Sequence, residues 1–259
     1  MSLASKRIIV ALDVPDRAAA LGLIERLAGV ISAFKVGNQL FTAEGPGLVR
    51  EIVSAGLDVF LDLKFHDIPN TVAGAVSSAS RLGVSILNVH ASGGIEMMRA
   101  AAGAVASSGA RPRAITLAAS IRQSADRETA ASNQPLRPAV IGVTVLTSMD
   151  QRSLADVGVP TDPVNQAVLL ARLAKKAGLD GVVASPQEVA PIREQIGDGD
   201  FIIVTPGVRP RGTESADQKR IGTPAQAIRD GSDYLVIGRP ITASPDPRAS
   251  AERIIQEIQ

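Results

Sequence analysis

Eight short apolar runs, spaced along the whole chain, constrain its fold more than any other feature. Each run is four to seven residues long and apolar on both faces, which is typical of parallel strands buried on both sides. The runs are Ile8–Leu12, Ile31–Val36, Val59–Leu63, Ser85–Val89, Val140–Leu146, Gly181–Ala184, Phe201–Val204 and Tyr234–Ile237. The segments between them carry helical apolar spacing, as at Ala18, Leu21, Ile24 and Leu27. Strand–helix alternation repeated eight times predicts an α/β protein with a closed (β/α)8 barrel (a TIM barrel), rather than an open doubly wound sheet.

The length of the chain fits one such barrel. At 259 residues it is long for an ordinary domain but within the usual range of a (β/α)8 barrel. No linker rich in Pro and Ser divides it, so we expect residues 1–259 to form a single catalytic TIM-barrel domain. One connection, at about 109–138, breaks the rhythm with a polar middle, and we expect it to be functional, partly disordered or locally helical.

Composition excludes several classes of function. Lys and Arg number 27 against 26 Asp and Glu, and aromatic residues make up only 2%, so we expect no nucleic-acid partner. The absence of cysteine excludes disulfides, thiolate metal sites and a cysteine nucleophile. No apolar stretch approaches eighteen residues and the N-terminus lacks a signal-peptide pattern, so we expect no membrane association and a cytoplasmic location.

Polar residues gather where the predicted strands end. The residues in these positions are Asp13, Lys35, Asp62, Lys64, His90, Thr147, Arg209, Gly238 and Arg239. The carboxyl ends of barrel strands meet at one face, and barrel enzymes keep their active sites there. The pattern therefore predicts an enzyme site at that end of the barrel.

The densest polar cluster is the hexapeptide Asp62–Asp67, which reads DLKFHD. Asp62 and Lys64 are two residues apart, so in a strand they point to the same side, and Lys35 on the neighbouring strand can reach them. Opposite charges that alternate in one cavity keep each other ionised and oriented. A solvated salt-bridge network at the barrel rim is the alternative interpretation of the same residues.

Two arginines indicate a phosphate site. Arg209 and Arg239 follow the seventh and eighth strands, the usual phosphate position in this barrel, and Gly238 lets the backbone approach a ligand closely. Arginine offers a fork of donors to phosphate oxygens. Taken singly, each arginine could equally be a solvated surface charge. The two histidines, His66 and His90, have no further ligand at metal-site spacing, so we expect no bound metal.

Taken together, these motifs resemble orotidine 5′-monophosphate decarboxylases. The string DLKFHDIPNTV, preceded by ALDVPD and FKVGNQLF, is followed in family order by NVHASGG, TVLTSM, TPGVRP, DQKR and DYLVIGRPIT. The resemblance runs from about Ile8 to Ile258, and its two longest motifs together are highly specific. Arg122–Pro138 departs from it, because the family pattern leads us to expect a shorter connection there.

The resemblance implies a role for each matching residue. Lys64 would protonate the ring carbon that loses CO2, and Asp62 would lie beside the departing carboxylate. Lys35, Asp62, Lys64 and Asp67 would form one charged network, with Asp67 and Thr71 donated across a homodimer interface. Asp13 and Lys35 would contact the ribose and Thr147 the pyrimidine, while Arg209, Gln218, Gly238 and Arg239 would hold the phosphate.

The reaction that the resemblance implies is the conversion of orotidine 5′-monophosphate to uridine 5′-monophosphate, without metal or organic cofactor. Three alternatives stay open at this point. One is a metal-dependent sugar-phosphate lyase or synthase, which can also use a D-x-K-x-x-D motif. The second is a Schiff-base aldolase that uses Lys64 or Lys35. The third is a regulatory barrel that binds nucleotides without turnover.

Overall fold

Eight parallel strands close into a barrel in the computed structural model, which describes residues 2–106, 110–114, 118, 136–197, 199–210, 220 and 222–259. Around the barrel the order is β1-β10-β9-β8-β7-β4-β3-β2, so strands consecutive along the chain are neighbours. The strands are β1 (Ile8–Ala11), β2 (Ala33–Gly37), β3 (Asp58–Phe65), β4 (Ile86–His90), β7 (Ala139–Val143), β8 (Gly181–Val183), β9 (Ile202–Thr205) and β10 (Tyr234–Ile237). Each of the eight predicted runs overlaps one of them, with ends that differ by no more than three residues, and the predicted (β/α)8 fold is confirmed.

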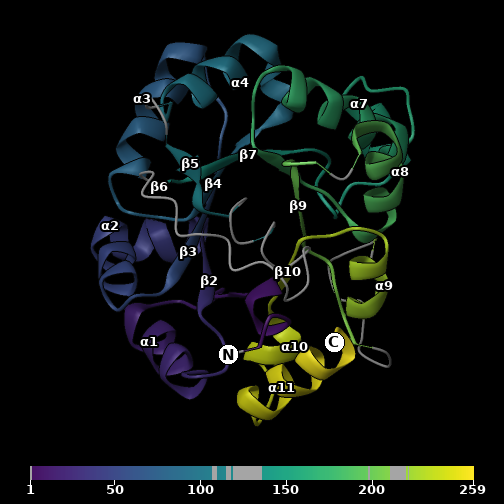
Figure 1. Ribbon diagram of the computed structural model, residues 1–259. Helices are drawn as coiled ribbons and strands as arrows, with labels where there is room; N and C mark the ends of the chain where they lie inside the picture. The colour runs from purple at the N-terminus through teal and green to yellow at the C-terminus, as the bar shows by residue number, and fades with distance from the viewer. Residues whose placement is uncertain are drawn as a thin grey trace.

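Helices surround the strands as an outer ring (Figure 1). They are α1 (Arg17–Arg26), α2 (Asn38–Ser54), α3 (Pro69–Ser80), α4 (Gly94–Gly103), α6 (Gln151–Asp156), α7 (Pro163–Lys176), α8 (Pro186–Ile196), α9 (Pro224–Arg229), α10 (Arg239–Thr242) and α11 (Pro247–Glu257). Two short 3₁₀ turns, Ser5–Arg7 and Ala91–Gly93, precede β1 and follow β4. Within the ranges given above, no helix is both long enough and apolar enough to cross a membrane.

Local sequence signals explain where many of the helices begin. Proline, whose missing N–H costs nothing in the first helical turn, opens α3, α7, α8, α9 and α11. The side chain of Asp162 caps α7 by accepting from the N–H groups of Val164 and Asn165. Gly178 and Gly231, which follow α7 and α9, have φ of +85° and +104° and turn the chain into the next strand.

Strand residues alternate between two apolar layers. One set, which includes Ile9, Phe60 and Val204, clusters inside the barrel. The other set, which includes Val10, Leu61 and Ile203, packs against the helices. Both faces of each strand are therefore buried, which is why the sequence shows continuous apolar runs instead of alternation.

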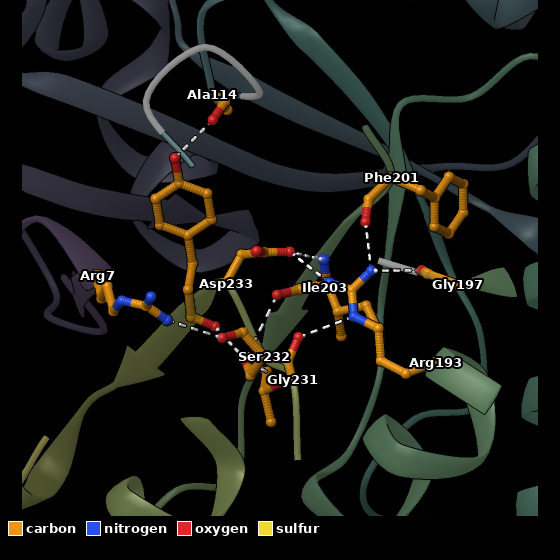
Figure 2. A network of polar contacts seen from close by, with 11 residues as sticks. Arg7, Ala114, Arg193, Gly197, Phe201, Ile203, Gly231, Ser232 and Asp233 are labelled. Carbon is orange, nitrogen blue, oxygen red and sulfur yellow. Dashed lines mark hydrogen bonds and ion pairs between the residues drawn. The ribbon is translucent and has the colours of Figure 1, made fainter. Parts of the chain in front are cut away.

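The amino ends of the strands carry a structural polar network. Asp233, directly before β10, accepts from the Arg193 guanidinium at 2.6 Å and from the backbone N–H of Ile203 at 2.8 Å (Figure 2). Arg193 also donates to the carbonyls of Gly231 and Phe201. The network joins α8, β9 and β10 at the end of the barrel opposite to the residues that follow the strands. Polar residues at this end stabilise the fold and leave the other end for chemistry.

The long connection at about 109–138 is described only in part, because 109, 115–117 and 119–135 lie outside the described residues. Its described part packs onto the base of the barrel. Arg111–Pro112 (β5) pairs in parallel with Leu136–Arg137 (β6), and Ala114 is buried with the residues inside the barrel. The hydroxyl of Tyr234 donates to the carbonyl of Ala114 at 2.7 Å. This part of the connection therefore helps to close the base of the barrel, a role that its polar sequence did not indicate.

Candidate active site

A cavity of about 520 Å³ lies at the carboxyl ends of the strands. This volume falls in the range of pockets that bind small-molecule ligands. Eight of the residues singled out from the sequence line it, namely Asp13, Lys35, Asp62, Lys64, Thr147, Arg209, Gly238 and Arg239. The prediction that polar residues after different strands meet at one site is correct in its geometry.

Two lysines and two aspartates form a continuous charged chain in this cavity. Nζ of Lys35 lies 2.9 Å from Oδ1 of Asp13 and 3.4 Å from Oδ2 of Asp62. Nζ of Lys64 lies 2.7 Å from Oδ1 of Asp62. Asp62 therefore sits between two ammonium groups and holds both in place. Lys35 and Asp62 are buried, so the array is not the solvated rim network that the sequence left as an alternative.

Ion pairing determines the charge states of Lys35 and Asp62. Burial alone would lower the pKa of Lys35, but the carboxylates of Asp62 and Asp13 outweigh burial and raise it. Burial alone would raise the pKa of Asp62, but the ammonium groups of Lys35 and Lys64 outweigh burial and lower it. Both groups are thus held in their charged forms at neutral pH, which preserves a fixed electric field inside the cavity.

The strand that carries Asp62 and Lys64 is irregular at these residues. Leu61 pairs with Leu87 and Phe65 with Val89, so three residues of β3 face a single residue of β4. Lys64 has φ of +52° and is the only described residue other than glycine with a positive φ. Both side chains reach the cavity as predicted, but they do so from a bulge and not from a regular strand. Such backbone strain concentrates at functional sites.

Sequence reasoning missed Asn88, the residue of β4 that faces this bulge. Its Nδ2 donates to Oδ1 of Asp62 at 2.7 Å, and its Oδ1 accepts from the backbone N–H of Lys64 at 2.8 Å. Its only signal in the sequence is a polar residue in the middle of an apolar run, ILNV.

Gly37, at the end of β2, was also missed. A Cβ atom at this position would lie 2.9 Å from Nζ of Lys35, closer than real Cβ contacts allow. Because Asp13 and Asp62 both hold that ammonium group, it has little room to move aside. The absence of a side chain at Gly37 therefore leaves space for the Lys35 end of the charged chain.

The proposed phosphate residues lie after β9 and β10. Arg209 is buried, and its backbone N–H donates to the carbonyl of Gly222 at 2.9 Å. Arg239 is exposed at the start of α10, directly after Gly238. The two arginines line the same cavity, as expected for a shared anion site. Gln218, the fourth residue assigned to the phosphate, lies outside the described residues.

Another buried ion pair, between Arg220 and Glu188, supports the loop that follows β7, and no pattern in the sequence indicates this pairing. Arg220 pairs with Glu188, which also accepts from the N–H of Ser185 at the start of α8. The same guanidinium donates to the carbonyls of Val145 at 3.1 Å and Leu146 at 2.8 Å. Because Leu146 directly precedes Thr147, this pair fixes the chain that presents Thr147 to the cavity.

Asp67 and Thr71 do not join the cavity within this chain. Both are exposed in the segment where β3 leads into α3, and neither is among the residues that line the cavity. Oδ1 of Asp67 accepts from the N–H of Ile68 at 2.6 Å. Ile68 itself is 68% exposed, which is unusual for a large apolar side chain. This surface next to the cavity is therefore available to a partner.

The described residues contain no group of three or more His, Asp or Glu side chains placed to hold a metal ion. The rings of His66 and His90 lie 5.5 Å apart between centroids, and burial, together with the neighbouring His66, lowers the pKa of His90. The chemistry that the described cavity residues offer is a pair of ammonium groups around a carboxylate, together with two guanidinium groups.

Comparison with known proteins finds relatives that match nearly the whole chain. A curated relative from Moorella thermoacetica, named "Orotidine 5'-phosphate decarboxylase", is 52% identical, and the match covers 99% of this chain and 93% of the relative. A relative of the same name from Pseudoalteromonas translucida is 48% identical, and the match covers 98% of each chain. A solved structure titled orotidine 5'-phosphate decarboxylase from Lactobacillus acidophilus superposes with a TM-score of 0.76 at 32% identity, over 98% of this chain and 99% of that one. A sequence model described as "Orotidine 5'-phosphate decarboxylase / HUMPS family" matches residues 6–254. The chain therefore belongs to the orotidine 5'-phosphate decarboxylase / HUMPS family of enzymes.

Proposed function

We propose that this chain decarboxylates orotidine 5′-monophosphate to uridine 5′-monophosphate, the last step of de novo synthesis of that nucleotide, with residues 1–259 acting as one catalytic domain. The observation that carries the proposal is the Lys35–Asp62–Lys64 array, in which Lys35 and Asp62 are buried and which shares a cavity with Arg209 and Arg239. The identity of 44–52% to curated relatives named for this activity supports the choice of substrate. The location expected from the sequence, the cytoplasm, stays a prediction.

Different cavity residues bind different parts of the substrate. Arg209 and Arg239 pair with the phosphate, with Gln218 and the backbone at Gly238 as further partners. The Asp13–Lys35 pair receives the ribose hydroxyls, because it offers an acceptor and a donor 2.9 Å apart. Thr147 contacts the pyrimidine. This arrangement places the ring carbon that reacts near Lys64, far from the phosphate.

The reaction breaks the bond between the ring carbon and the carboxylate. CO2 leaves, and the electron pair of the broken bond stays on the ring carbon. The ammonium group of Lys64 stabilises this developing negative charge and then transfers a proton to the carbon. Lys64 is left neutral and regains a proton from solvent. Asp62 orients Lys64 through the 2.7 Å ion pair and faces the departing carboxylate.

A homodimer completes the network. Asp67 and Thr71 are exposed beside the cavity, and we propose that each chain inserts them into the site of its partner. Asp67 then adds a carboxylate on the Lys64 side, and the array becomes Lys35–Asp62–Lys64–Asp67. No metal or organic cofactor takes part in the proposed reaction.

The test follows the absorbance of orotidine 5′-monophosphate with purified protein, with and without a chelator. The proposal predicts turnover that the chelator does not change. Turnover of a sugar phosphate that the chelator abolishes would support a metal-dependent lyase or synthase instead. Binding of uridine 5′-monophosphate without any turnover would indicate a regulatory barrel. Covalent trapping of a substrate by borohydride on Lys64 or Lys35 would indicate an aldolase.

A further inference from the structure

We propose that Asn88 is a positioning residue that fixes the relative geometry of Asp62 and Lys64 for the reaction. The inference rests on the proposed function, because it assigns Asn88 to the same proton transfer. Asn88 has an exposed fraction of 0%, and it is not among the residues that line the cavity. It therefore acts through its two neighbours on β3 and not through contact with a substrate.

One end of the Asn88 side chain supports the bulge in β3. Between the pairs Leu61–Leu87 and Phe65–Val89, β3 has two residues more than β4, so the backbone ladder is interrupted there. The side-chain Oδ1 of Asn88 takes the place of a ladder acceptor, because it receives the N–H of Lys64 at 2.8 Å. This bond is made to the one described non-glycine residue whose φ is positive. Asn88 thus stabilises the backbone conformation that aims Lys64 at the cavity.

The other end of the side chain fixes the carboxylate of Asp62. Nδ2 of Asn88 and Nζ of Lys64 both donate to the same oxygen, Oδ1, each at 2.7 Å. The second oxygen, Oδ2, lies 3.4 Å from Nζ of Lys35. An amide is neutral, so it restrains the rotation of the carboxylate without cancelling the charge that the two lysines need. Asparagine is suited to this position, because its one side chain offers a donor and an acceptor.

Two substitutions separate hydrogen bonding from packing. Asn88→Ala removes both bonds and leaves a cavity, whereas Asn88→Leu fills a similar volume and makes neither bond. We expect kcat for orotidine 5′-monophosphate to fall by roughly 10²-fold in both variants, because a displacement of about 1 Å in a reacting group can cost that much. The Kd of uridine 5′-monophosphate should change less than about threefold, since Arg209 and Arg239 are untouched.

The matched control is Ser232→Ala, at the base of the barrel. Ser232 is also buried, and its hydroxyl lies within hydrogen-bond distance of Oγ1 of Thr205 at 2.8 Å and of the carbonyls of Tyr234 at 3.0 Å and Ile203 at 3.4 Å. It should lose a similar amount of thermal stability and keep its kcat. If Asn88→Leu has the kcat of wild type, Asn88 has only a structural role and the proposal is wrong. The same conclusion follows if Ser232→Ala lowers kcat as much as the Asn88 variants do.

Hydrogen exchange of the Lys64 amide gives a readout that does not depend on activity. The protein labelled with ¹⁵N at lysine, with the signal assigned by Lys64→Arg, should show a protected Lys64 N–H that exchanges at least tenfold faster in Asn88→Leu. Equal protection in the two proteins would overturn the proposed bond. Kinetics of the variants show whether the role of Asn88 or the proposed function itself is wrong. If wild type turns over and Lys64→Ala does not, full activity in both Asn88 variants refutes the inference alone.

Discussion

Replacing Arg239 with alanine tests whether the arginines after β9 and β10 hold a phosphate. Arg239 is exposed, so its loss should change the free energy of unfolding by no more than about 0.5 kcal/mol. A bound phosphate would cover this side chain, and a hydrogen bond to a charged group contributes about 1.5–3 kcal/mol. At about 1.4 kcal/mol per decade, kcat/KM for orotidine 5′-monophosphate should fall roughly 10- to 150-fold.

The assay compares two substrates and two arginines. Orotidine, which lacks the phosphate, should be turned over slowly by wild type and at nearly the same rate by Arg239→Ala. The control is Arg248→Ala on α11, which removes another exposed arginine with a surface ion-pair partner, Glu252 at 3.3 Å. It should leave kcat/KM unchanged for both substrates. Equal losses for orotidine and its phosphate in Arg239→Ala would refute the assignment and would mean that Arg239 supports the barrel or the charged array.

Two further predictions concern the charged array and its completion by a partner chain. Mixing inactive Lys64→Ala and Asp67→Ala chains should restore part of the activity, because one of the two sites in a heterodimer then has both wild-type residues. If the formation of heterodimers is verified and no activity returns, the active site is not shared between the two chains. The pKa of Asp62 is lowered from its ordinary value of 3.8 in the folded protein, so the stability from its charge is complete above that value and is lost as the pH falls below it. The difference in Tm between wild type and Asp62→Asn should therefore be largest near pH 7 and shrink below about pH 4. A difference in Tm that does not vary with pH would show that Asp62 is not stabilised as an anion.

The eight strands could be predicted because both faces of each are buried, which makes each run apolar and short. The positions of Asp62, Lys64 and Arg209 in the cavity followed from one rule, that residues after parallel strands meet at one end of the barrel. The bulge in β3 could not be predicted, because Asp62 and Lys64 are two positions apart in the sequence whether the strand is regular or bulged. Register against β4 decides between the two, and register is a tertiary property.

Buried polar partners were the other part that the sequence did not reveal. Asn88 is a single polar residue inside an apolar run, and nothing in that run says which groups it will meet. Glu188 and Arg220 are 32 residues apart, and their pairing depends on how α8 and the segment after β9 pack together. Long-range pairs of this kind leave no periodic signal, so they appear only once the barrel is assembled.

The central claim is that Lys64 supplies the charge and the proton for the decarboxylation. The most direct measurement is kcat for orotidine 5′-monophosphate in Lys64→Ala, made beside wild type on protein that still binds uridine 5′-monophosphate. Because Lys64 acts mainly in the transition state, kcat should fall by at least the roughly 10²–10⁴-fold that general acids contribute, while nucleotide binding is largely kept. A variant that retains more than about a tenth of the wild-type kcat would contradict the account, because a general acid contributes more than that.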